Sequence, residues 1–285
     1  MAEIREAFRT SPFGKAGLVI VGIFLLLAVV GPYIAPYNPW QTADEIEDIL
    51  APPSWKHLLG TDELGRDILS QVIHGTRITL IIGLSAAAIA VVVGTVVGVT
   101  AGYFGGALDA VLMRVTDSFL SMPFIVLAIV IVSLMGRSLG NIILAIGLVQ
   151  WTQAARITRS QTLSIKERVF VLRARALGAG PFYIMRRHIL PNVLPLVFAN
   201  MTLVTSLAIL SEAFLSFLGL GDPTKFSWGI IIRYAFETGA VSIGAWWYFL
   251  PAGICIMLVV LGFSFISNTL DEALNPKLRR GQVVV

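Results

Sequence analysis

The sequence predicts an all-α protein that crosses a membrane several times. The 285-residue chain is 56% hydrophobic and only 13% charged, which is too apolar for an ordinary soluble domain. Because a bilayer crossing needs roughly 20 apolar residues, each run without a charged residue can supply one transmembrane helix. These runs cover 16–43, 78–108, 118–136, 138–155, 189–211 and 238–270.

We therefore predict six transmembrane helices, near 17–35, 79–102, 118–136, 139–157, 192–217 and 245–268. Pro32 and Pro36 close the first run and no small-x-small cleavage site follows convincingly, so we expect a retained helix and not a signal peptide. The pairs Gly94/Gly98 and Gly98/Gly102 predict that the second helix packs closely against another helix.

The distribution of Lys and Arg predicts that both termini are cytoplasmic. In that orientation the inner segments 1–15, 103–117, 156–191 and 269–285 hold 15 basic residues, and the outer segments 36–77, 137–138 and 218–244 hold 6. Cytoplasmic loops carry such an excess of basic residues. Much of the net charge of +4 therefore reflects the inner loops, and it does not indicate nucleic-acid binding.

The chain divides into four parts. Residues 1–37 are a basic tail and the first helix, 38–77 an acidic extracytoplasmic segment, 78–268 a five-helix body with a basic loop at 164–190, and 269–285 a cytoplasmic tail. Near the end of the outer segment, Ile68, Leu69, Val72 and Ile73 recur at helical spacing. We expect a short helix on the outer face there, acting as a clamp over the bundle or as a contact for a partner.

The pattern of the 164–190 loop predicts a short helix, a tight turn and a shorter helix. Ser164 and Glu167 have the spacing of a capping box, which starts a helix. Gly178 suits the left-handed position that ends one, and Pro181 suits the start of the next. Pro191 is then expected to limit the second helix.

The basic side chains of the first of these helices point to two sides. Lys166 and Arg173 share one face, and Arg168 and Arg175 lie nearly opposite. A helix resting on lipid would gather its charges on one side, so we expect a partner cleft that grips this helix from both flanks. The alternative is an ordinary basic cytoplasmic loop.

Residues 172–191 resemble the cytoplasmic loop with which the permeases of ABC importers dock onto a separate ATPase. The positions that match the family pattern are Ala174, Gly178, Leu190 and Pro191. Leu172 and Arg173 stand where the family has an acid and an alanine, and His188 stands in place of an isoleucine. The resemblance assigns ATPase coupling to Arg173, Ala174, Arg175, Gly178, Leu190 and Pro191.

Two further stretches resemble the dipeptide, oligopeptide and nickel branch of this family. Residues 57–70 (HLLGTDELGRDILS), continued by 75–80 (GTRITL), form one, and residues 211–221 (SEAFLSFLGLG) form the other. Together with the loop they stand in the family's order, and the resemblance covers nearly the whole chain. It is strongest to the second of the two permeases in such systems.

The resemblance implies a type I ABC importer permease fold in a prokaryotic plasma membrane. The implied partners are a homologous second permease, two ATP-binding subunits that carry ATP and Mg, and an extracytoplasmic solute-binding protein. The chain itself would hold no cofactor and break no bond. Peptides are the expected substrate class, and relatives also import nickel and oligosaccharides.

Three residues are candidates for a path or gate. Glu212 is the one acidic residue within a predicted span, and ionisable groups inside a membrane are costly to bury and often functional. It either lines the path or outer gate, or it is a carboxylate hydrogen-bonded to a neighbouring helix. Trp228, like Trp246 and Trp247, is expected to anchor the membrane interface. A role for Trp228 or Arg233 in gripping substrate is the alternative.

Sequence motifs for catalysis are absent. The chain has no Walker Gly-x-x-x-x-Gly-Lys-Ser/Thr motif, and its three histidines are scattered, with no Cys pair to complete a metal site. No His lies in a predicted span to activate a serine. The rival function is a stand-alone channel or secondary carrier, which predicts transport without an ATPase and more charge within the spans.

Overall fold

The computed structural model describes residues 2–42 and 45–274, which are helical apart from connections and one isolated β-bridge between Thr61 and Asp67. The elements are α1 (Ala2–Thr10), α2 (Pro12–Ile34), the short 3₁₀ turn η1 (Ile46–Asp48), α3 (Ile68–Phe104), α4 (Gly106–Leu120), α5 (Phe124–Met135), α6 (Leu139–Lys166), α7 (Val169–Ala176), α8 (Pro181–Ile184), the π-helical turn η2 (Met185–Ile189), α9 (Leu190–Phe217), α10 (Trp228–Glu237) and α11 (Trp246–Leu274).

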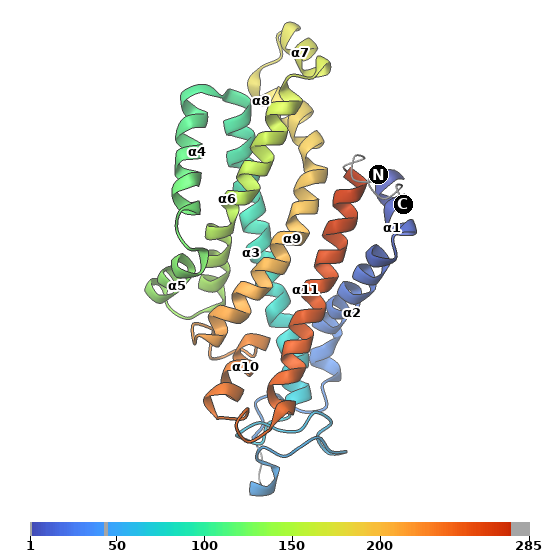
Figure 1. Ribbon diagram of the computed structural model, residues 1–285, viewed down its shortest axis with the longest axis vertical. Helices are drawn as coiled ribbons and strands as arrows, with labels where there is room; N and C mark the ends of the chain where they lie inside the picture. The colour runs from blue at the N-terminus through green and yellow to red at the C-terminus, as the bar shows by residue number, and fades with distance from the viewer. Residues whose placement is uncertain (1, 43–44, 275–285) are drawn as a thin grey trace, which may run out of the picture.

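The long helices run side by side along the long axis of the molecule (Figure 1). α7 and α8 lie at one end, and α10 and the connection before α3 lie at the other. α1 and the C-terminal end of α11 lie in the half of the molecule that holds α7. The all-α prediction is confirmed.

Four stretches of the described residues are long and apolar enough to cross a membrane: α2, α3, the continuous stretch Pro181–Phe217, and α11. α4 and α5 are each too short to cross alone. They make a fifth crossing only if the pair, bent by 88° at a short break, is counted as one span. α6 contains the predicted fourth span, 139–157, but polar and basic residues such as Gln150, Gln153 and Arg156 keep it less apolar than the other four.

The prediction of a straight helix over 118–136 is wrong. α4 ends at Leu120 and α5 begins at Phe124, directly after Pro123. Proline lacks a backbone N–H and disfavours helical geometry at the residue before it. The chain therefore leaves the helix after Leu120 and turns sharply before Pro123.

The stretch 103–117, expected to be a cytoplasmic loop, is mostly helical. It belongs to α4, whose carboxylates pair with α6. Arg159 donates two hydrogen bonds to Asp109, at 2.5 and 2.6 Å, and Arg156 donates one to Asp117 at 2.6 Å. These partners lie 50 and 39 residues apart in the chain, so the charges that indicated a loop instead hold two helices together.

The prediction of a separate short helix on the outer face is also wrong. α3 begins at Ile68 and continues for 37 residues. Asp67 caps its N-terminus by accepting a hydrogen bond from the backbone N–H of Ser70 at 2.8 Å. Since no proline interrupts the sequence after Ile68, the first turns run directly into the membrane helix.

α3 and α6 make the most extensive helix–helix contact among the described residues. Gly94, Gly98 and Gly102 lie four residues apart on one face of α3, and we call this contact the glycine seam. A Cβ added to Gly94 would lie 2.5 Å from the Ala154 Cβ, and one added to Gly98 would lie 2.5 Å from the Ala155 carbonyl oxygen. The predicted close packing is confirmed, because only glycine permits this approach.

We expect Gly98→Leu to destabilise the protein, because the new side chain would force α6 away from α3. Overpacking of this kind typically costs about 1–3 kcal/mol. Thermal unfolding in detergent should therefore shift to lower temperature. Gly22→Leu is the matched control, since a Cβ there meets nothing within 4 Å. Equal unfolding temperatures for the two variants would contradict the importance of the glycine seam.

Candidate functional site

The predicted docking loop forms a hairpin of α7 and α8 at one end of the molecule (Figure 1). We call residues 168–190 the docking hairpin. The capping box expected at Ser164 and Glu167 is wrong, because α6 continues to Lys166 and Glu167 is its C-cap. A capping box needs a chain that enters the helix from an extended conformation, whereas Ser164 is already helical. Arg168, which has an extended backbone conformation, is the N-cap of α7.

α7 ends in a Schellman motif around Gly178. The Gly178 N–H donates to the Arg175 carbonyl and the Ala179 N–H donates to the Ala174 carbonyl, both at 3.0 Å. Gly178 has a φ of +83°, in the left-handed region that favours glycine. Pro181 begins α8. The predicted roles of Gly178 and Pro181 in the turn are confirmed.

The prediction that Pro191 limits the second helix is wrong. α8, η2 and α9 form one helical stretch of 37 residues, with Pro191 near the start of α9. In the π turn, the Leu190 N–H donates to the Met185 carbonyl, five residues back. This wider turn accommodates a residue without an N–H. The docking hairpin therefore runs directly into a membrane helix.

The docking hairpin has a buried anchor and an exposed surface. Val171, Ile184 and Ile189 are fully buried and belong to one apolar cluster with residues of α3, α6 and α9. On the exposed surface, Leu177 is 89% and Phe182 71% exposed. Exposed arginines also occur along it: Arg168, Arg173, Arg175, Arg186 and Arg187. An exposed apolar surface with a basic surround is typical of a binding site for another protein.

The structure brings only some of the predicted coupling residues together. Arg173, Ala174 and Gly178 line a hollow between α7 and α8, together with Tyr183 and His188. The remaining coupling residues lie apart from this hollow. The Arg175 guanidinium lies over the Tyr103 ring, 5.9 Å from its centre, Pro191 lines a second hollow beside α8, and Leu190 is partly buried at the base of the hairpin.

The base of the docking hairpin is tied to the glycine seam. Lys166, the last residue of α6, donates from Nζ to the carbonyl oxygen of Gly102 at 2.9 Å. Gly102 is the last member of the seam, and a Cβ there would lie 2.7 Å from the Thr162 Cβ. The base of the hairpin is therefore bonded to α3 as well as continuous with α6.

Glu212 is fully buried where α9 meets α3 and α10. The Ser216 hydroxyl donates to its Oε1 at 2.7 Å, while its Oε2 has no hydrogen-bond partner among the described residues. The hydroxyls of Thr79 and Ser227 lie beside the carboxyl group. Each already accepts a backbone N–H from α10, so its own proton is left to donate toward Glu212.

The prediction that Trp228 anchors the membrane interface is wrong. Trp228 is fully buried, and its indole N–H donates to the Val72 carbonyl at 3.1 Å. Its ring meets Phe24 of α2 edge to face, with centres 5.6 Å apart. It therefore fastens α10 to α3 inside the protein. Trp246, in contrast, is 53% exposed at the start of α11, as an interfacial residue would be.

Arg233 stabilises the connection between α9 and α10. Its Nε donates to Glu237 at 2.8 Å, and its guanidinium lies against Gly219, where an added Cβ would approach it to 2.8 Å. Gly219 has a φ of +86°, which favours glycine. No hydrogen bond between described residues joins Arg233 to Glu212 or Trp228.

Asp222 ties the same connection to α6. Its carboxylate accepts hydrogen bonds from the hydroxyl of Thr224 at 2.7 Å and from the backbone N–H of Leu139 at 3.3 Å. Partial burial raises the pKa of Asp222, but the hydrogen bonds from Thr224 and Leu139 outweigh it, so the pKa lies below its ordinary value. The charged form therefore holds the connection in place at neutral pH.

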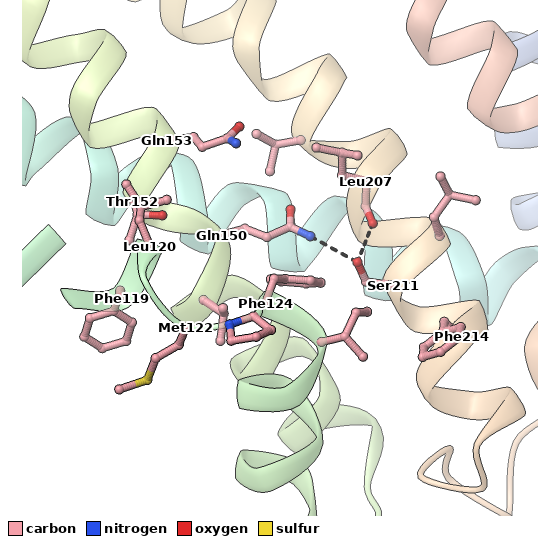
Figure 2. A pocket seen from close by; sticks show the side chains of 15 residues that line it. Phe119, Leu120, Met122, Phe124, Gln150, Thr152, Gln153, Leu207, Ser211 and Phe214 are labelled. Atoms are coloured by element: carbon pink, nitrogen blue, oxygen red, sulfur yellow. Dashed lines mark hydrogen bonds between the residues drawn. The ribbon is translucent and has the colours of Figure 1, made fainter. Parts of the chain in front are cut away.

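A cavity of about 700 Å³ lies between the α4–α5 break, α6 and α9 (Figure 2). Gln150 of α6 points across it toward Ser211 of α9. None of the three residues predicted for a path or gate lines it. The lining comes from separate parts of the chain, and the signal that sequence reasoning missed was the pair Gln150 and Gln153 within an apolar helix.

Long apolar helices, an exposed docking hairpin continuous with them, and a cavity among the helices define a polytopic membrane permease. Two family models match the chain. The model described as "Binding-protein-dependent transport system inner membrane component" matches residues 94–280, and that of the "N-terminal TM domain of oligopeptide transport permease C" matches residues 1–53. The protein belongs to this family of ABC transporter permeases.

Curated relatives match nearly the whole chain. It is 38% identical to the dipeptide transport system permease protein DppC of Bacillus subtilis (strain 168), over 95% of this chain and 84% of the relative. Identity to the oligopeptide transport system permease protein OppC of the same organism is 34%, over 96% and 88%. Identity to the di/tripeptide transport system permease protein DppC of Pseudomonas aeruginosa (strain UCBPP-PA14) is 35%, over 98% and 93%.

Family membership settles the coarse functional class. The protein is a multi-pass inner-membrane subunit of a binding-protein-dependent ABC transporter, of the peptide permease type. It is a non-catalytic subunit of a permease family without cofactors, in which a partner ATPase handles ATP. The predicted family, fold class and non-catalytic role are confirmed, and the rival of a stand-alone channel or carrier finds no support.

The geometry around Glu212 favours the structural interpretation over the gate. We expect Glu212→Gln to keep an acceptor for the Ser216 hydroxyl and to leave transport near normal. Glu212→Ala should leave buried hydroxyls unpaired, at a typical cost of about 1–3 kcal/mol each, and should lower the amount of assembled complex. Complex yield after detergent extraction and substrate-stimulated ATPase activity in liposomes measure the two effects. A Gln variant that assembles fully and transports nothing would make Glu212 a path or gate residue.

Proposed function

We propose that the protein is the second-type permease of an ATP-driven, binding-protein-dependent importer of di- and oligopeptides. It forms half of the translocation path with a homologous second permease. Two ATP-binding subunits and an extracytoplasmic solute-binding protein complete the assembly. Relatives named as dipeptide, oligopeptide and di/tripeptide permeases, each covering at least 95% of the chain, support the substrate class. A nickel or oligosaccharide importer is the alternative within the family.

The continuity of the docking hairpin with membrane helices on both sides is the observation that carries this proposal. On one side, only Glu167 and Arg168 separate α7 from α6. On the other, η2 joins α8 to α9 without a break. Such a hairpin can pass a force from a cytoplasmic partner into the membrane. We assign the coupling to Arg173, Ala174, Arg175, Gly178, Leu190 and Pro191.

We further propose that both termini and the docking hairpin are cytoplasmic and that the 38–67 connection lies outside. The excess of basic residues on the hairpin side of the sequence supports this orientation. The four-part division of the chain is kept with two shifted boundaries, because α3 begins at Ile68 and α11 ends at Leu274. Residues 275–285 of the proposed cytoplasmic tail lie outside the described residues.

In the mechanism that follows, ATP binding closes the two ATPase subunits and displaces the docking hairpin of each permease. The displacement reaches α3 through the glycine seam and α9 through η2. The helix bundles then switch from inward-open to outward-open, and the peptide passes along a path that includes the cavity between the α4–α5 break, α6 and α9. This chain contributes the path and the coupling and performs no bond-breaking step.

Gly178→Leu tests the coupling assignment. A β-carbon at a φ of +83° is strained, so the variant should be inserted and folded with a reshaped hairpin. We expect fewer ATPase subunits to co-purify with it and ATP-dependent uptake of a labelled dipeptide to fall.

Gly140→Leu, near the start of α6 and outside the docking hairpin, is the control. A Cβ there also meets nothing within 4 Å, and its position inside α6 is open to any residue. It should co-purify and transport nearly as wild type. Normal ATPase association together with normal uptake in Gly178→Leu would refute the coupling role of this turn.

A further inference from the structure

The cavity between α4–α5, α6 and α9 has an uncharged lining with few polar groups. Of its lining residues, none is charged or a histidine or cysteine. Its polar side chains are Gln150, Thr152, Gln153 and Ser211. Phe119, Phe124 and Phe214 contribute aromatic walls. A metal ion would find no anionic or imidazole ligand here, whereas a neutral amide backbone with varied side chains would be accommodated.

The bent backbone between α4 and α5 lies at the edge of this cavity. Met122 and Pro123 lie at the break and line the cavity. Within a membrane, non-helical backbone is tolerated only where it is buried in protein or lines an aqueous space, because lipid cannot satisfy its polar groups. The 88° bend therefore faces protein or an aqueous space and not lipid.

Gln150 has an unused hydrogen-bond acceptor beside this cavity. Its Nε2 donates to the Ser211 hydroxyl at 3.3 Å, and that hydroxyl donates to the Leu207 carbonyl at 2.6 Å. Figure 2 shows this chain of hydrogen bonds crossing from α6 to α9. The Gln150 Oε1, in contrast, is buried without a partner among the described residues. A buried acceptor left unpaired is unfavourable, so this oxygen is available to a donor that enters the cavity.

We propose that Gln150 is a specificity-determining residue that accepts a hydrogen bond from a main-chain N–H of the peptide in transit. Ser211 acts as a positioning residue, because it holds the carboxamide by its nitrogen and leaves the oxygen free. The uncharged lining lets acidic and basic peptides pass alike, and the aromatic walls contact apolar side chains. This inference rests on the proposed function as a peptide importer.

The test compares two dipeptides that differ only in the substituent on the peptide nitrogen. Glycylglycine has one peptide N–H, and in glycylsarcosine a methyl group replaces that hydrogen. Uptake of each is measured in liposomes holding the complete transporter, its binding protein and ATP. For Gln150→Leu, which keeps the bulk and removes the acceptor, we expect glycylglycine uptake to fall about 3- to 10-fold, the range of one hydrogen bond. Glycylsarcosine uptake should change little.

The binding protein's preference between the two dipeptides is the same with the wild-type and the variant permease. It therefore cancels when the two permeases are compared. Gln161→Leu, on the same helix and outside the cavity lining, is the matched control and should leave the ratio of the two uptake rates at the wild-type value. An equal fall for both dipeptides in Gln150→Leu would assign Gln150 a merely structural role and overturn the proposal, as would no fall at all. Failure of the wild-type transporter to import either dipeptide would instead overturn the proposed function on which it rests.

Discussion

The close approach of α3 and α6 at the glycine seam is the constraint on which the rest of the structure depends. Without a Cβ at Gly94, Gly98 and Gly102, the backbone of α3 lies directly against backbone and side chains of α6 over about two turns. This places the arginines of α6 where they pair with α4, and it places Lys166 where it reaches α3. The docking hairpin is thereby fixed to two membrane helices at once.

Polar groups fix the other end of α3. Trp228 donates to Val72 and Thr79 of α3, and Glu212 of α9 lies beside the hydroxyls of Thr79 on α3 and Ser227 at the start of α10. A buried carboxylate is costly unless it is hydrogen-bonded, so Glu212 specifies one arrangement of α3, α9 and α10. One helix thus links the docking hairpin at one end with the α10 connection at the other.

Sequence patterns predicted the features that depend on neighbouring residues and missed those that depend on distant ones. Gly178 and Pro181 act within a few residues, so the turn of the docking hairpin could be predicted. The stretch 103–117 was expected to be a loop because Asp109 and Asp117 find their arginine partners 50 and 39 residues away, whereas the break at Pro123 is a local signal that the predicted third span overlooked. Burial of Trp228 and assembly of the cavity around Gln150 likewise require contacts between separate helices. Local hydrophobic periodicity in the sequence does not reveal such contacts.

We infer that α3, α6 and the docking hairpin move as one body when ATP acts on the complex. Spin labels at Leu172 on α7 and Val92 on α3, which are 41% and 62% exposed, report on it directly in a Cys255→Ser background, provided that the labelled complex retains its ATPase activity. Double electron–electron resonance should give the same distance between the two labels in nucleotide-free and ATP-bound complexes. The distance from Leu172 to a label on the second permease should change. A change between Leu172 and Val92 as large as that between the two permeases would contradict the account.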